Sequence, residues 1–80
     1  STTTPSDDAL ELELIGAIDE AIQRLPESQR LAVILRRYED MTYEEIAETM
    51  DSSVSAIKSL LFRARAQLRE ELAPYLSGEP

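Results

Sequence analysis

The stretch "MTYEEIAETMDSSVSAIKSLLFRARAQLREEL", residues 41–72, contains the pattern that decides the fold. Apolar side chains first recur at the spacing of a short helix, at Tyr43, Ile46, Ala47 and Met50. The same spacing then continues over a longer helix, at Val54, Ile57, Leu61, Ala64, Leu68 and Leu72. The residues "DSS" leave room only for a tight turn between the two. A short helix, a tight turn and a longer helix predict a helix-turn-helix.

Capping residues mark where these two helices begin. Thr42 and Glu45 have the spacing of a capping box, and either Ser52 or Ser53 is placed to cap the longer helix. Pro74 is expected to end that helix, because proline cannot continue it. The local signals therefore agree with the apolar spacing.

Two more amphipathic helices are predicted upstream. The first has apolar positions at Leu10, Leu14, Ile15, Ile18, Ala21, Ile22 and Leu25, and Pro26 separates it from the second. The second carries Leu31, Ile34, Leu35 and Tyr38 on its apolar face and is expected to run to about Glu39. The predicted fold is all-α, a four-helix domain containing a helix-turn-helix.

The chain is expected to have three parts. Residues 1–21 are predicted to be an acidic linker leading into the first helix, residues 22–73 the helix-turn-helix domain, and residues 74–80 a frayed tail. Because the chain starts at Ser1 without a methionine, we expect it to be a piece of a longer protein.

Composition excludes several classes of function. The 80 residues include no cysteine and no histidine, so a disulfide framework, a thiolate metal site and the commonest general base are absent. Neighbouring glutamates such as Glu44 and Glu45 point about 100° apart on a helix and do not converge on one site. We therefore expect no enzymatic activity, no metal and no cofactor. No apolar run approaches the roughly 20 residues that span a bilayer, and a cytoplasmic location is predicted.

The charge is unevenly distributed. The formal net charge is -8, which by itself argues against binding to nucleic acid. Residues 1–29 hold seven acidic residues and one basic residue, whereas residues 52–69 hold Lys58, Arg63, Arg65 and Arg69 and no acidic residue. Because the Debye length is about 8 Å at physiological salt, such a basic segment can act locally.

The longer helix of the helix-turn-helix carries a phenylalanine among its charges. Lys58, Ser59, Phe62 and Arg63 lie away from its apolar stripe, on the side that could enter a major groove. Lysine and arginine donate to guanine, serine donates or accepts, and an apolar ring contacts a thymine methyl group. Two other interpretations remain open: a merely solvated outer face, or a protein interface formed by Phe62 with Leu60. Phe62 could also pack against the first helix as part of the core.

Arg36 and Arg37, at the end of the second helix, have three candidate roles. They can complement the helix dipole, pair with Glu39 or Asp40, or contact phosphates.

Two segments together resemble a known family. "LPESQRLAVILRRYEDMTYEEIAETM" followed by "SAIKSLLFRARAQLREEL", within about residues 22–72, resembles region 4 of the bacterial sigma factors, in the extracytoplasmic-function group. The motifs that carry the resemblance are the leucine-proline opening, the "YEEIA" helix and the "KSLLFRAR" helix. The resemblance implies recognition of the -35 promoter element in transcription initiation. It also implies docking on the β flap of RNA polymerase and binding of an anti-sigma factor.

By position, the resemblance implies two sets of DNA contacts. Lys58, Ser59, Phe62 and Arg63 match base-reading positions, and Ser53, Ser55, Ala56 and Arg65 match positions at or near the DNA backbone. The sequence departs from the family at three places. Ala56 stands where threonine is usual, Ser55 where glycine is usual and Leu60 where arginine is usual.

Two alternatives from other classes follow. One is a sigma-like interaction module that docks an anti-sigma factor or polymerase with weak or no DNA binding, which the departures and the net charge favour. The other is the effector domain of a response regulator.

Overall fold

The computed structural model describes residues 5–76, and all of its regular structure is helical. The helices are α1 (Pro5–Gln23), α2 (Glu27–Arg37), α3 (Tyr43–Thr49), α4 (Val54–Glu71) and α5 (Ala73–Leu76). Within residues 5–76 there is no strand, which confirms the predicted all-α class. Residues 1–4 of the predicted linker and residues 77–80 of the predicted tail lie outside the described residues.

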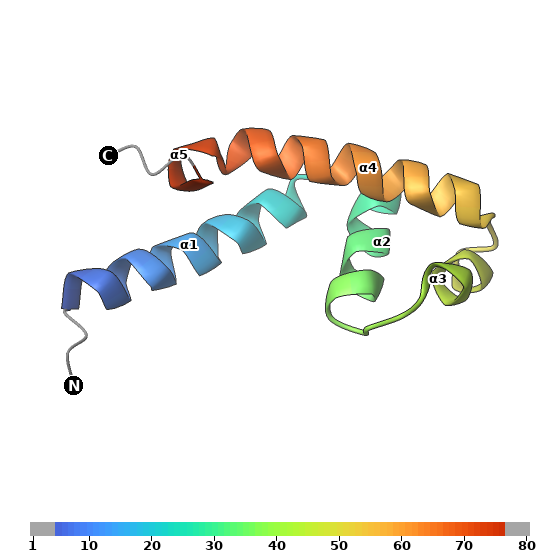
Figure 1. Ribbon diagram of the computed structural model, residues 1–80, viewed down its shortest axis with the longest axis horizontal. Helices are drawn as coiled ribbons and strands as arrows, with labels where there is room; N and C mark the ends of the chain where they lie inside the picture. The colour runs from blue at the N-terminus through green and yellow to red at the C-terminus, as the bar shows by residue number, and fades with distance from the viewer. Residues whose placement is uncertain (1–4, 77–80) are drawn as a thin grey trace.

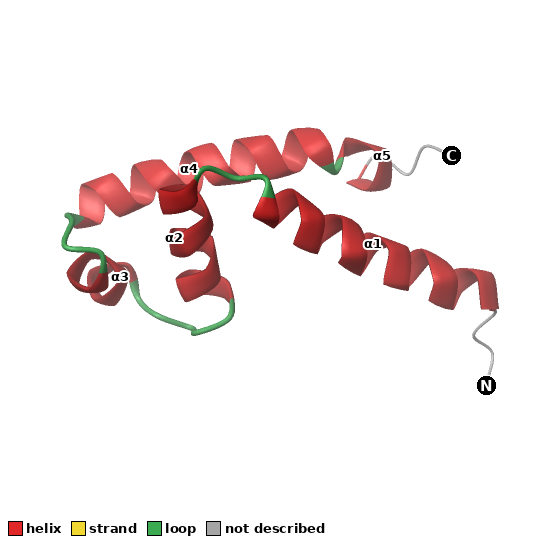
Figure 2. Ribbon diagram, turned by 180° about the vertical axis from the view of Figure 1, so that it is seen from behind, coloured by secondary structure: helices red, strands yellow, loops and turns green. Residues whose placement is uncertain are grey.

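Helix α4 is the axis of the molecule. Helices α2 and α3 pack against its first half, and α1 runs beneath its second half toward the N-terminus (Figure 1). The view from behind shows the N-terminal part of α1 diverging from α4 (Figure 2). The resulting shape is elongated, with extents of 46 × 26 × 16 Å. The helix-turn-helix therefore occupies one end and α1 projects from the other.

The core lies where α4 meets the other three long helices. Ile46 and Ile57 are completely buried, and Leu61 is 4% exposed. The buried cluster consists of Ile22, Leu25, Ala32, Val33, Ile46, Ala47, Ile57, Leu61 and Ala64. Burying a side chain of this size contributes about 1.5–3 kcal/mol. The apolar faces predicted for α3 and α4 are both confirmed.

Side-chain and backbone hydrogen bonds fix the start of α3 and the turn that follows α3. The Glu45 amide donates to Thr42 Oγ1 (3.1 Å) and the Thr42 amide donates to Glu45 Oε1 (2.8 Å), so the predicted capping box is present. Ser53, one of the two candidates, caps α4 by accepting from the Ala56 amide at 3.1 Å. Asp51 has φ 53°, the left-handed conformation that closes a helix C-terminus. At the end of α3 the Asp51 amide donates to the Glu48 carbonyl (3.2 Å) and the Ser52 amide to the Ala47 carbonyl (2.7 Å), which closes the helix just before the Ser53 cap begins α4.

The predicted apolar face of α2 is confirmed in part. Ile34 and Leu35 are half-buried and pack against the core cluster, whereas Leu31 and Tyr38 are exposed. The fully buried residues of α2 are Ala32 and Val33, which were not predicted. Helix α2 lies between α1, α3 and α4, so more than one of its sides is covered.

Several helix ends also differ from the predictions. Helix α2 ends at Arg37, and the buried Leu25 lies beyond the end of α1 at Gln23. Helix α4 ends at Glu71, and Ala73–Leu76 form a short additional helix where a frayed tail was expected. Pro74 is tolerated there because the first turn of a helix needs no proline N–H. Helix α1 crosses the boundary predicted between residues 21 and 22.

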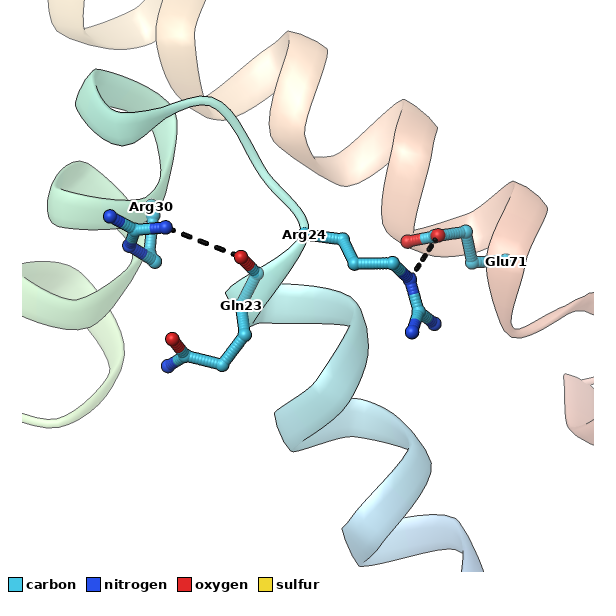
Figure 3. A network of polar contacts seen from close by, with 4 residues as sticks. All are labelled: Gln23, Arg24, Arg30 and Glu71. Carbon is cyan, nitrogen blue, oxygen red and sulfur yellow. Dashed lines mark hydrogen bonds and ion pairs between the residues drawn. The ribbon is translucent and has the colours of Figure 1, made fainter.

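Polar contacts tether α1 to its neighbours (Figure 3). Arg24 Nε donates to Glu71 Oε1 at 2.8 Å, and Arg30 Nη1 donates to the Gln23 carbonyl at 3.2 Å. The Glu71 carboxylate raises the pKa of Arg24 above its ordinary value, through this hydrogen bond and then through its charge. Arginine is already cationic at neutral pH, so the shift predicts no change of stability there. The tether fixes the C-terminal end of α1, and farther along the helix Tyr75 Oη of α5 donates to Glu13 Oε1 at 3.4 Å.

Candidate nucleic-acid interface

The four side chains predicted to contact bases lie together on the outer face of α4. Lys58, Ser59, Phe62 and Arg63 are all exposed, and with Val54 and Ser55 they line one shallow, open depression. Phe62 is 71% exposed. The interpretation of Phe62 as a core residue is therefore wrong. An exposed ring between two cations and a hydroxyl can make the apolar and polar contacts that base edges offer.

The residues predicted at the DNA backbone are distributed differently. Ser53 and Ser55 are exposed at the N-terminal end of α4, beside the outer face. Ala56 is half-buried, and its amide is already used by the Ser53 cap. Arg65 is exposed but lies toward α1 and α2, where it lines a separate groove. Their roles at DNA remain predictions.

Leu60 does not belong to the outer face. It is half-buried and packs against the core cluster, so an interface formed by Leu60 with Phe62 is wrong. On the helix it lies about 160° from Phe62, on the far edge of the apolar stripe. An arginine at this position would replace a packing contact.

The structure distinguishes the roles of Arg36 and Arg37. Arg36 Nη1 donates to the Met41 carbonyl at 2.9 Å, and its guanidinium lies 5.3 Å from the centre of the Tyr43 ring. It thus joins the end of α2 to the start of α3. Arg37 lies 5.8 Å from the Tyr38 ring centre. Among the described residues neither pairs with Glu39 or Asp40, because the one ion pair there joins Arg24 to Glu71.

An apolar groove between α1, α2 and α4 was not predicted. Its floor and walls are Ile18, Ile22, Val33, Leu61, Leu68 and Leu72, and Arg36, Arg37 and Arg65 lie at its rim. No local sequence pattern indicates this groove, because its lining comes from three helices whose relative placement only the fold defines. The only local indication of the groove is the position of Arg65, which flanks the apolar stripe of α4.

Other kinds of site find no support in residues 5–76. Across that range, no group of three or more carboxylate side chains is arranged to hold a metal ion. No helix that the structure describes is both long and apolar enough to cross a bilayer. The fold and the exposed basic face of α4 define a helix-turn-helix protein of the DNA-binding type.

Comparisons with known proteins identify the family. Residues 15–68 match the model of the family described as sigma-70, region 4. The chain belongs to this family, as the resemblance implied. Sigma factors are not enzymes, so the prediction of no enzymatic activity is confirmed.

Curated relatives cover most of this chain. It is 37% identical over 73 residues (91% of this chain) to the ECF RNA polymerase sigma-E factor of Haemophilus influenzae. It is 39% identical over 64 residues (80% of this chain) to the RNA polymerase sigma-H factor of Pseudomonas aeruginosa. The chain spans 39% and 33% of the lengths of these two proteins. It therefore corresponds to one part of such a factor.

Proposed function

We propose that this chain is the part of an extracytoplasmic-function sigma factor that recognises the -35 promoter element and so directs RNA polymerase to its promoters. The outer face of α4 carries the proposal. There Lys58, Ser59, Phe62 and Arg63 project together from a helix whose opposite side is anchored in the core. Membership of the sigma-70 region 4 family supports the same function.

The proposed mechanism is insertion of α4 into the major groove, which is wide enough for one helix. Arg63 and Lys58 donate to guanine O6 and N7, Ser59 adds one hydrogen bond, and the Phe62 ring contacts a thymine methyl group. Ser53 and Ser55, at the N-terminal end of α4, are placed for the DNA backbone. Such backbone contacts would set the register of α4 on the duplex.

Affinity for DNA would depend on a second partner. One small module makes few phosphate contacts, so its affinity alone is low and falls steeply with salt. The apolar groove with its arginine rim supports docking of the polymerase β flap or of an anti-sigma factor. A protein that acts on polymerase and promoter in a bacterium works in the cytoplasm.

A second candidate is an interaction module with little DNA binding. The same groove favours it, together with the net charge of -8 and the alanine at position 56. The two candidates differ in what the outer face of α4 does, so DNA binding separates them.

Selection from a random-sequence duplex library tests the proposal. The chain is immobilised, bound duplexes are recovered at low salt, and the enriched sequences are compared. We expect one short asymmetric motif, and its loss in the Lys58→Ala, Arg63→Ala double variant. As a matched control, Arg24→Ala, Arg69→Ala removes two positive charges outside the depression and should preserve the motif. Recovery of duplexes without any shared motif would favour the interaction module.

A further inference from the structure

Helix α1 carries apolar side chains that nothing in the described part of the chain covers. Leu12 is 70% exposed and Ile15 is 51% exposed. Ile15 lies on the same face as Ile18 and Ile22, one and two turns before them. Ile18 and Ile22 line the apolar groove. The groove is therefore continuous with an exposed apolar stripe along the projecting half of α1.

The two ends of this surface have opposite charge. Asp8 and Glu11 are exposed and lie on the face of Ile15, at i−7 and i−4. From residue 5 to residue 23 the chain holds acidic residues and no basic one. The groove at the other end has Arg37 and Arg65 at its rim, both exposed and neither in an ion pair among residues 5–76. An acidic apolar helix and a basic apolar groove are complementary.

We propose that the occupant of this groove is α1 of a second copy of the chain, in a reciprocal dimer. Each α1 would lay Leu12 and Ile15 against the half-buried Ile18 of the other copy. Asp8 and Glu11 would then lie near Arg37 and Arg65 of that copy. None of its contacts uses the four side chains proposed to read bases, and a measurement without DNA separates it from any role of Arg65 at the DNA backbone.

The proposed contacts are compatible with a symmetric dimer. If two α1 helices run antiparallel with residue 15 opposite residue 18, residue 18 is also opposite residue 15, as a two-fold axis requires. The projection of α1 away from α4 leaves its N-terminal half accessible to such a partner (Figure 1). The dimer would bury the groove in both copies. It would thereby compete with any other protein that docks in the groove.

Sedimentation equilibrium of the chain alone, without DNA or polymerase, tests the proposal. We expect the average mass to rise from one chain toward two as the concentration increases from micromolar to millimolar. Raising the salt concentration should weaken this association, because the contacts include screened charges.

Charge reversal identifies the contacts. Asp8→Arg, Glu11→Arg makes both surfaces basic, and Arg37→Glu, Arg65→Glu makes both acidic. Each variant alone should dissociate at least about tenfold more readily, because like charges then face each other. An equimolar mixture should associate as the parent does, since both contacts then join opposite charges. Arg36 is left unchanged because it holds the Met41 carbonyl.

The matched control is Glu48→Arg, Glu70→Arg, which changes the net charge as much as the α1 variant does. Both glutamates are exposed and neither lines the groove, so its association should equal that of the parent or exceed it slightly. A chain that stays monomeric at millimolar concentration would overturn the proposal. So would an association that mixing the two reversed variants fails to restore. Either failure would leave the DNA-binding proposal untouched.

Discussion

Leu61 and Phe62 are neighbours in the sequence, but they point about 100° apart on α4, one into the core and the other to solvent. Leu61 is 4% exposed and contacts the core, whereas Phe62 is 71% exposed among Lys58, Ser59 and Arg63. Transfer free energy alone would bury the phenylalanine at least as readily as the leucine. The difference shows that the phase of the helix, fixed by the whole apolar stripe, decides which residue is buried. Because the stripe buries Leu61, the Phe62 ring stays in contact with water, which is energetically unfavourable.

The largest expected effect concerns the inner face. Leu61→Ala should lower the free energy of unfolding by about 2–5 kcal/mol, because it removes buried methyl groups and leaves a cavity. For an 80-residue chain this approaches the whole stability. Urea denaturation followed by circular dichroism measures the change. A variant whose free energy of unfolding stays within about 0.5 kcal/mol of the parent would place Leu61 at the surface and overturn the helix phase described above.

The second expected effect is on DNA affinity, and it differs between two arginines of α4. Arg63→Ala should weaken specific DNA binding by about 1–3 kcal/mol and relax the preference at one base pair. Arg65→Ala should weaken binding equally on all duplexes, and lower the salt slope by about one, if Arg65 contacts phosphate. Competition with single-base variants of the selected duplex separates the two patterns. Uniform loss for Arg63→Ala would make Arg63 a backbone contact.

A smaller effect is expected at Leu60, at the edge between the two faces. Leu60→Arg should cost about 1 kcal/mol of stability, because a half-buried leucine loses part of its packing while the arginine stem covers the rest. Thermal denaturation measures this, with Ala66→Arg on the exposed side of α4 as the control. Family resemblance alone predicts the contrary: unchanged stability and tighter, more salt-dependent DNA binding.

Much of the fold could be predicted from local sequence signals. The capping box at Thr42, the cap at Ser53 and the apolar stripe of α4 act within a few residues, so the helix-turn-helix was predictable. The burial of Ala32 was not, because Ala32 lies off the helical spacing set by the large side chains of α2 and its burial depends on three neighbouring helices. The short helix α5 was also missed, because a proline near a helix end permits either outcome.

The same division holds for the candidate site. Lys58, Ser59, Phe62 and Arg63 lie within two turns of one helix, so their grouping follows from helix geometry and is present in the structure. The groove with Arg37 and Arg65, and the pairing of Arg24 with Glu71, join segments far apart in the chain. Only the placement of α1 and α2 on α4 brings these residues together.

Phe62→Ala separates base reading from partner binding most directly. We expect a free energy of unfolding within about 0.5 kcal/mol of the parent, because an exposed ring contributes little to stability. We also expect weaker binding to the selected duplex, because the contact with a thymine methyl group is lost, and unchanged binding to the polymerase flap proposed as a partner. Full DNA affinity with a loss of partner binding of about 2 kcal/mol would make Phe62 a protein anchor and contradict base reading by α4.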